Sequence, residues 1–187
     1  SLLSKFKHNT DVICAANCIC HIPDLTDLIK SVDLMLTLKG VFVFEEPYLG
    51  SMFDKVSYDQ IYDEHIYMFS VSSIQKIFRK FDMELIDAYP QETHGGSMRY
   101  VVARKNQREI NNNLKNIIKH EIDKDIDNIG SCLKFKKKCE FSRKKIVDLL
   151  NKHKKQNKKI CGYAATSKST TVLNYCQIGS NFIDCIY

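Results

Sequence analysis

The N-terminal part of the chain alternates between strand-like and helix-like patterns of apolar residues. Residues 11–16, DVICAA, and residues 41–44, VFVF, are apolar runs typical of strands that are buried on both faces. Between them apolar residues recur at helical spacing, and Lys39-Gly40 marks the expected end of that helix. The helical positions are Leu25, Leu28, Ile29, Val32 and Leu36. The pattern predicts a strand, a helix and a parallel strand joined by a right-handed crossover.

A second group of elements follows residues 58–70, which show neither a helical nor a strand period. We expect Ser70 or Ser72 to cap a helix that starts there. Its apolar face is Ile74, Ile77, Phe78 and Phe81. Residues 83–88 and 98–103 then predict two strands, and the short glycine-containing turn between them favours an antiparallel pair.

The C-terminal part predicts helices and then a second strand–helix–strand unit. Residues 106–158 lack proline and are expected to be helical in two or three pieces. One helix would carry Ile117, Ile118, Ile122, Ile126 and Ile129, and another Phe135, Phe141, Ile146, Leu149 and Leu150. After these we expect a strand at 159–163, a loop at 164–169, a helix at 170–176 and a strand at 182–187, at which the sequence ends. The fold class is therefore α/β.

Composition narrows the classes of protein that fit this pattern. The 187 residues allow one or two domains, and no apolar stretch approaches the length of a membrane span. The polar N-terminus does not resemble a secretory signal. None of the eight cysteines forms a C-x-x-C pair, so the sequence predicts no metal site, reduced thiols and a cytoplasmic location.

The net charge of +6 is concentrated in residues 134–159, which include KFKKKCEFSRKK and NKHKKQNKK. Such a run can bind nucleic acid or can be the solvated face of a helix. We favour the solvated face, because the aromatic residues do not alternate with the basic ones as in a base-stacking platform. We therefore expect neither a nucleic acid nor a membrane as partner.

Residues 58–70, YDQIYDEHIYMFS, are the first candidate for chemistry. Tyr62, Asp63, Glu64 and His65 are four consecutive titratable residues, and Glu64 lies beside a potential base in His65. A surface loop that packs its tyrosines and solvates its acids accounts for this stretch about as well as an active site does.

Polar motifs follow three of the predicted strands, which favours a functional site. Asn17 and His21 follow the first strand, Glu45 and Tyr48 the second, and the turn His94-Gly95-Gly96 the third. Ligands of open α/β sheets bind in the crevice outside the carboxyl ends of the strands, so these motifs are expected to converge. His21, Glu64 and His65 can act as acid or base near neutral pH, and Tyr62 can stabilise an oxyanion.

The segment A-A-T-S-K-S-T at residues 164–170 precedes a predicted helix. Its hydroxyls and Lys168 suit a phosphate at the helix N-terminus, but a Ser/Thr-rich helix cap explains the same residues, and spacing alone favours the cap.

Several ordered motifs resemble a known family. They are N-x-x-x-H-I-P-D at 17–24, F-E-x-P-Y-L-G at 44–50, D-Q-I-Y-x-E-H at 59–65, Y-x-F-S at 67–70, T-H-G-G-S at 93–97, and G-Y-x-A-x-S-K-x-x-T at 162–171, which L-N-Y-C follows at 173–176. Together they resemble the S-adenosylmethionine-dependent sugar C-methyltransferases, which act on nucleotide-linked 4-keto-deoxysugars.

The resemblance implies a domain division and a reaction. The family has an N-terminal zinc-binding domain, a Rossmann-like class I methyltransferase domain and a C-terminal α/β domain. On that plan, residues 1–105 would be the C-terminal half of the methyltransferase domain, 106–158 a helical connector and 159–187 part of the C-terminal domain. A base removes the proton beside the ketone, and the resulting enolate takes the methyl group from S-adenosylmethionine.

The resemblance also implies roles for individual residues. His65 is the favoured base, and Tyr62, Glu64 and His21 are the other active-site groups. We assign Asn17 to the cofactor. The nucleotide-sugar substrate is assigned Tyr48, His94, Gly95, Ser167 and Lys168.

The sequence departs from the family pattern mainly in its cofactor part. These residues contain neither the family's glycine-rich loop nor the acidic residue that holds the ribose. They also lack the zinc-ligand cysteines, so we expect zinc only in an N-terminal domain outside them. Asp63 stands where histidine is common, and Ala164 where glycine is common. The chain alone is therefore expected to be inactive. A non-catalytic nucleotide-sugar-binding module is the alternative, and the sugar, the nucleotide and the oligomeric state stay open.

Overall fold

The computed structural model describes residues 5–163 and 166–187. The chain forms two compact units. The first comprises Ser1–Met52 and Ile66–Asp127, and the second comprises Phe53–His65 and Asn128–Tyr187. The short segment Phe53–His65, which contains most of the candidate catalytic residues, thus belongs to the same unit as the C-terminal region.

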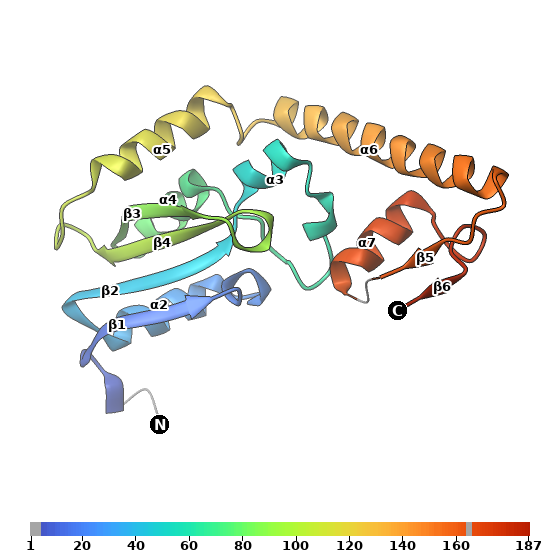
Figure 1. Ribbon diagram of the computed structural model, residues 1–187. Coiled ribbons are helices and arrows are strands. Elements are labelled where there is room, and N and C mark those ends of the chain that lie inside the picture. The colour runs from blue at the N-terminus through green and yellow to red at the C-terminus, as the bar shows by residue number, and fades with distance from the viewer. Residues whose placement is uncertain (1–4, 164–165) are drawn as a thin grey trace. The chain divides into compact units, whose positions relative to one another are not determined.

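A four-stranded mixed sheet forms the centre of the first unit (Figure 1). Its strands are β1 (Thr10–Ala16), β2 (Leu36–Pro47), β3 (Met83–Gln91) and β4 (Ser97–Arg104), in the order β1-β2-β4-β3. β1 and β2 are parallel, and β4 is antiparallel to both β2 and β3. The predicted parallel pair and the predicted antiparallel pair are both confirmed. The carboxyl ends of β1, β2 and β3 consequently lie at one edge of the sheet.

Side-chain caps set the starts of two helices in this unit. Asp24 accepts a hydrogen bond from the backbone N–H of Asp27 at the start of α2 (Leu25–Met35). Ser70 caps α4 (Val71–Arg79) through a reciprocal capping box with Ser73, which decides between the two serines that the sequence offered. Further helical elements are η1 (Ile19–His21), α3 (Leu49–Lys55), η3 (Thr93–Gly95) and α5 (Asn112–Asp123).

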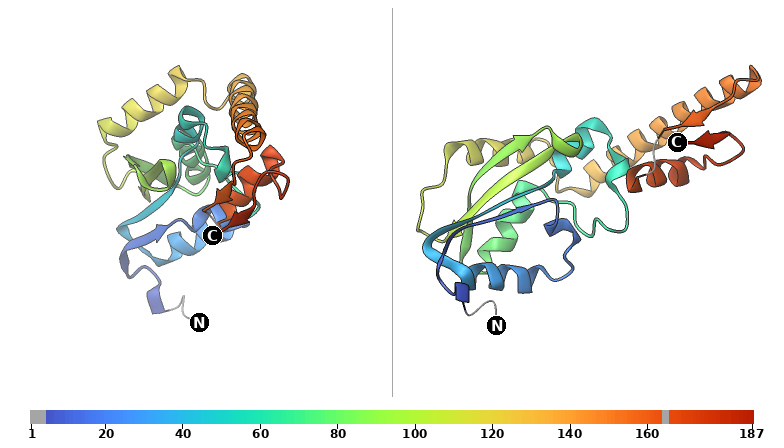
Figure 2. Two further views of the ribbon diagram at one scale, coloured as in Figure 1. Left: turned by 45° about the vertical axis from the view of Figure 1, so that its right-hand side comes forward. Right: turned by 60° about the horizontal axis from the view of Figure 1, so that its bottom comes forward.

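The core of the first unit lies between the sheet and the helices α2, α4 and α5, which Figure 2 shows from two further sides. Aromatic rings form its centre: Phe44 stacks on Phe42 and on Tyr100, each at a centroid distance of 4.9 Å, and on Phe78 of α4 at 5.8 Å. These rings bury large apolar areas and fix α4 against the sheet. The opposite face is more open, since Val12 on the edge strand β1 is 54% exposed. The prediction that residues 11–16 are buried on both faces is wrong, because among the described residues β1 has a neighbouring strand on one side only and none of its residues is fully buried.

The second unit contains a long helix and a short strand–helix–strand motif (Figure 1). The long helix is α6 (Ile129–Lys155), and the motif consists of β5 (Cys161–Gly162), α7 (Ser167–Cys176) and β6 (Cys185–Ile186). β5 and β6 pair in parallel, which confirms the second predicted strand–helix–strand unit. The turn η2 (Tyr58–Gln60) precedes the candidate catalytic residues. None of the described helices combines the length and apolar character needed to cross a bilayer.

Several predicted boundaries are wrong. β5 and β6 are shorter than the strands predicted at 159–163 and 182–187. The stretch around Lys39-Gly40 does not end a helix, because α2 already ends at Met35 and β2 begins with Leu36. α7 begins at Ser167, three residues earlier than expected, because Thr166 rather than a later residue is its cap.

The helical region also divides at a different place. The isoleucines at 122, 126 and 129 do not share a helix, because α5 ends at Asp123 and Asn128 caps a new helix. Between these ends, Asp125 adopts a left-handed backbone conformation with φ of 52°, which interrupts helical geometry. The expected loop residues Ala164 and Ala165 lie outside the described residues. The proposed division at residues 105 and 158 stays a prediction.

Candidate active site

Backbone hydrogen bonds tie together the loops that follow β1, β2 and β3. The N–H of Asn17 donates to the carbonyl oxygen of Glu45 at 2.8 Å, and the N–H of Tyr48 donates to the carbonyl oxygen of Gly96 at 3.1 Å. Asn17 adopts φ of 52°, a left-handed conformation that asparagine tolerates better than most residues. The predicted convergence of these polar motifs at one sheet edge is therefore confirmed within the first unit.

Glu46 anchors the loop that carries His21. Its side chain is fully buried, and its Oε1 accepts hydrogen bonds from the backbone N–H groups of Cys18 at 3.0 Å and Ile19 at 2.6 Å. Burial raises the pKa of the Cys20 thiol, and the neighbouring Glu46 carboxylate adds to this rise. Cys20 is consequently a neutral thiol rather than a nucleophile. The sequence analysis did not single out Glu46, because a buried acid directly after a strand has no pattern of its own.

Two buried acceptors at this edge have no hydrogen-bond partner among the described residues. They are Oε2 of Glu46 and Oδ1 of Asn17, the residue assigned to the cofactor. A buried polar atom without a partner costs free energy, on the order of 1–3 kcal/mol. Such atoms indicate where a ligand can donate hydrogen bonds.

Glu45 attaches the turn after β3 to β2. Its carboxylate accepts a hydrogen bond from the Thr93 hydroxyl at 2.7 Å and one from Arg99 at 2.9 Å. The Thr93 hydrogen bond is the main cause of a lowered pKa for Glu45, and the bond and charge of Arg99 contribute. A carboxyl with a lowered pKa stabilises the fold above its unfolded pKa, and that contribution is lost as the pH falls through the folded pKa.

The turn itself needs its glycines. Gly95 and Gly96 have φ values of 82° and 125°, which side chains rarely adopt, and His94 has φ of 51°. The His94 side chain is exposed at the sheet edge, and its proximity makes a small contribution to the lowered pKa of Glu45. The assignments of His94 and Gly95 to the substrate stay predictions.

The Tyr48 hydroxyl points into the first unit. It donates a hydrogen bond to Oε1 of Glu121 at 2.9 Å, so the aromatic ring is the surface that Tyr48 offers to a ligand. Gly50 permits this pose, because a Cβ atom there would lie 2.5 Å from the Tyr48 ring. Glu121 is 2% exposed and also accepts hydrogen bonds from Val71 N, Ser72 N and Ser72 Oγ at 2.6–2.8 Å.

Tyr62 and His65 form a hydrogen-bonded pair in the second unit. The Tyr62 hydroxyl lies 2.7 Å from Nε2 of His65, and Nδ1 of His65 lies 2.9 Å from the carbonyl oxygen of Gln60. A carbonyl oxygen only accepts, so Nδ1 carries the proton and the Nε2 of neutral His65 accepts from Tyr62. Nε2 is thus a base with its lone pair directed at a hydroxyl. The Glu64 side chain is exposed.

A hollow of about 560 Å³ lies between this stretch and α7. Tyr62 and Asp63 line one side, and Ser167 lines the other together with threonines of α7. The Thr171 hydroxyl donates to the carbonyl oxygen of Ile61 at 3.4 Å, which joins the two sides. Two motifs that are about a hundred residues apart in the sequence therefore meet. The described residues that line the hollow do not include Lys168.

The first turn of α7 is closed by a capping box. The Thr166 side chain accepts from Ser169 N at 3.4 Å, and the Ser169 hydroxyl accepts from Thr166 N at 2.9 Å. The helix-cap interpretation of this segment is confirmed. Capping does not exclude a ligand, because Ser167 and Lys168 lie in the first turn, where the N-terminal partial charge favours anions.

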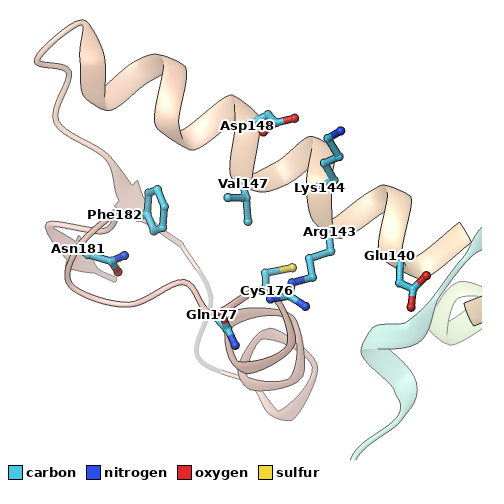
Figure 3. A pocket seen from close by; sticks show the side chains of 9 residues that line it. All are labelled: Glu140, Arg143, Lys144, Val147, Asp148, Cys176, Gln177, Asn181 and Phe182. Carbon is cyan, nitrogen blue, oxygen red and sulfur yellow. The ribbon is translucent and has the colours of Figure 1, made fainter. Parts of the chain in front are cut away.

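A second hollow in this unit, of about 470 Å³, lies between α6 and the residues that follow α7 (Figure 3). Arg143 and Lys144 line it beside Glu140 and Asp148, and Phe182 adds an apolar wall. Its lining carries charges of both signs and none of the residues assigned to catalysis, cofactor or substrate. The candidate site of this unit is therefore the hollow beside Tyr62.

Gln60 is a further residue that the sequence analysis did not assign. It is buried, and both polar atoms of its side chain lack a hydrogen-bond partner within residues 5–163 and 166–187. Its carbonyl oxygen fixes the His65 ring, so its backbone already has a role in the pair. The D-Q-I-Y motif could have indicated a functional role for Gln60. A glutamine among aromatic residues is, however, also typical of a side chain that only packs in the interior.

The fold and the site define a class of protein. An open α/β sheet with polar loops at the carboxyl ends of its strands is the arrangement of Rossmann-like proteins. In agreement with this, residues 3–88 match the family described as a methyltransferase domain.

The second half of the chain identifies a more specific family. Residues 92–187 match the family described as the C-methyltransferase C-terminal domain, and the chain belongs to this family. A curated relative, the C-methyltransferase NovU from Streptomyces niveus, is 26% identical over 163 residues. The match covers 87% of this chain and 39% of NovU, so the chain spans well under half of that relative's length.

Proposed function

We propose that this chain forms the substrate-binding and proton-transferring part of an S-adenosylmethionine-dependent C-methyltransferase that acts on a nucleotide-linked keto-deoxysugar. The observation that carries the proposal is the hydrogen bond between Tyr62 and His65, because Tyr62 also lines a hollow together with Ser167. The relationship to a protein named as a C-methyltransferase supports the type of reaction. The test is methyl transfer to a nucleoside-diphosphate 4-keto-deoxysugar by the protein in its natural full length.

Proton removal is the step that these residues can perform. The hydrogen bond from Nδ1 to the Gln60 carbonyl oxygen fixes the ring and selects the tautomer of neutral His65 whose Nε2 carries the lone pair. Nε2 takes the proton from the carbon beside the ketone, and the Tyr62 hydroxyl turns from Nε2 to the enolate oxygen and donates a hydrogen bond to it. The 2.7 Å contact between the Tyr62 hydroxyl and Nε2 of His65 supports this pairing of a base with an oxyanion donor.

The cofactor would be held partly by the first unit. The orphaned acceptors Oδ1 of Asn17 and Oε2 of Glu46 lie at the strand ends, where the ligands of such sheets bind. They fit a ligand that donates hydrogen bonds, as the amino and hydroxyl groups of S-adenosylmethionine do. The bound cofactor supplies an electrophilic methyl group.

The first turn of α7 would bind the diphosphate of the substrate. Replacing Lys168 by alanine should weaken nucleotide-sugar binding about tenfold at low salt and much less at high salt, because ionic screening weakens the contact. Binding is measured by calorimetry at two ionic strengths. Lys158→Ala, which removes an exposed lysine elsewhere in this unit, is the control with the same charge change. Equal affinities for both variants and the wild type would leave this turn as a helix cap only.

Residues 1–187 by themselves are expected to bind S-adenosylmethionine only weakly. Within the described residues β1 is an edge strand, and Val12 and Cys14 on it are exposed, which favours self-association. Titration calorimetry and light scattering on the purified chain measure both properties. A monodisperse monomer with micromolar affinity, about −8 kcal/mol, would mean that these residues form a complete cofactor site.

A further inference from the structure

The two short strands of the second unit place a pair of cysteines opposite each other. Cys161 on β5 and Cys185 on β6 are direct partners in the parallel register. Their Sγ atoms lie 2.7 Å apart. Cys161 is exposed and Cys185 is half-buried, so dissolved reagents can reach the pair. Neither residue takes part in the proposed methyl transfer.

The strand register suits a covalent bond between these residues. Neighbouring strands lie about 4.8 Å apart, and direct partners project their side chains to the same face of the sheet. Disulfides join residues whose Cα atoms are roughly 4.4–6.8 Å apart. The backbone spacing of a paired position therefore falls within the range that a disulfide needs.

Several contacts hold the two strands together before any bond forms. The N–H of Asp184 donates to the carbonyl oxygen of Ile160 at 2.8 Å, and the N–H of Tyr187 donates to that of Gly162 at 2.9 Å. The Asp184 carboxylate also accepts from Ile160 N at 2.7 Å and from Lys154 at 3.1 Å. The cysteines are consequently preorganised, and their effective concentration toward each other is high.

The surroundings of the pair distinguish the two thiols. The hydrogen bond with Cys161 is the main cause of a lowered pKa for Cys185, and Tyr187 and the charge of Lys159 contribute, while Asp184 opposes them. The same hydrogen bond raises the pKa of Cys161. Because the thiolate is the nucleophile, Cys185 is the thiol that reacts first.

We propose that Cys161 and Cys185 form a thiol pair that is oxidised to an intrachain disulfide by exchange with a low-molecular-weight disulfide. The Cys185 thiolate attacks one sulfur of the small disulfide, whose S–S bond breaks and releases one small thiolate. The Cys161 thiolate then attacks Sγ of Cys185 and displaces the second small thiolate. Two protein thiols are oxidised, one small disulfide is reduced, and both protons end on the released small thiols.

The bond would close a segment that contains all of α7. Cys161 and Cys185 are 24 positions apart, and each strand of the pair is two residues long. Strands this short contribute little stability by themselves, so a crosslink should have a large effect. Oxidation is expected to raise the midpoint of thermal unfolding by roughly 10 °C.

The experiment treats the full chain with oxidised glutathione in a graded series of ratios to reduced glutathione. Free thiols are counted, and peptide mapping by mass spectrometry identifies any crosslink. The wild type is expected to lose two of its eight thiols and to give a peptide that joins Cys161 to Cys185. Glutathione adducts at both positions without a crosslink, or a crosslink between other cysteines, would overturn the proposal.

Three serine variants test the roles of the thiols. Cys161→Ser should stop at a stable glutathione adduct on Cys185, since no second thiol resolves it. Cys185→Ser should give no crosslink and at most a glutathione adduct on Cys161, since the partner thiol is missing. Cys132→Ser, which removes an exposed cysteine on α6, should crosslink like the wild type. Crosslinking that depends on Cys132, or an adduct in Cys161→Ser that is resolved instead of persisting, would contradict the assigned roles.

Discussion

Replacing His65 by alanine is expected to lower the rate of methyl transfer roughly a hundred- to ten-thousand-fold in the full-length protein. The reason is that His65 is the proposed base, and the bond from Nδ1 to the Gln60 carbonyl oxygen fixes its ring with the lone pair of the neutral tautomer on Nε2. The affinities for the cofactor and for the nucleotide sugar should change little, because the imidazole acts on the reacting carbon. Steady-state kinetics and calorimetry on the same preparations measure the two effects separately.

Two further variants make this result specific. His120→Ala removes an exposed histidine of α5 and should keep the wild-type rate. Tyr62→Phe should keep the base but lose the hydroxyl that lies 2.7 Å from it, with a smaller loss of about ten- to a hundred-fold. If His65→Ala transferred the methyl group at the wild-type rate, another group would be the base.

Replacing Glu121 by alanine is expected to destabilise the first unit by about 3–5 kcal/mol. The buried carboxylate accepts hydrogen bonds from Tyr48, Val71 and Ser72, and alanine would leave these donors without their acceptor. The substitution would also remove a negative charge that stabilises the N-terminus of α4. Urea denaturation followed by circular dichroism gives the free energy of unfolding.

Glu109→Ala is the matched control, because Glu109 is an exposed glutamate shortly before α5. It should change the free energy of unfolding by less than about 0.5 kcal/mol. The free energy of unfolding of Glu121→Gln should lie between those of Glu121→Ala and Glu109→Ala. The glutamine amide keeps one acceptor oxygen, but it turns an N–H₂ group toward other hydrogen-bond donors. If Glu121→Ala and Glu109→Ala were equally stable, the four hydrogen bonds would not support the fold.

The strand–helix–strand units were predictable because their signals are local. The apolar runs DVICAA and VFVF predicted strands, although β1 is not buried on both faces. Asp24 and Ser70 are strong caps directly before periodic helices. The order of polar motifs after the strands predicted which loops meet at the sheet edge, and the bond from Asn17 to Glu45 confirms it. The parallel sense of the strands then determines which ends come together.

The parts that the sequence did not reveal depend on tertiary contacts. Glu121 lies in the polar stretch K-H-E-I-D, and nothing in that pattern shows that its carboxylate is buried on the N-terminus of α4. The division between α5 and α6 depends on the cap at Asn128, which competes with an apolar period that continues through it. The meeting of Tyr62 with Ser167 depends on how Phe53–His65 packs in the second unit.

The most direct test of the central claim is hydrogen exchange at the carbon beside the ketone, without any cofactor. The full-length protein is incubated in deuterated water with thymidine diphosphate 4-keto-deoxyglucose, and deuterium incorporation is followed by NMR. If His65 is the base of a sugar C-methyltransferase, the protein should accelerate exchange well above buffer, and His65→Ala should abolish the acceleration. Binding of the sugar nucleotide with exchange no faster than in buffer would contradict the account and identify a non-catalytic binding module.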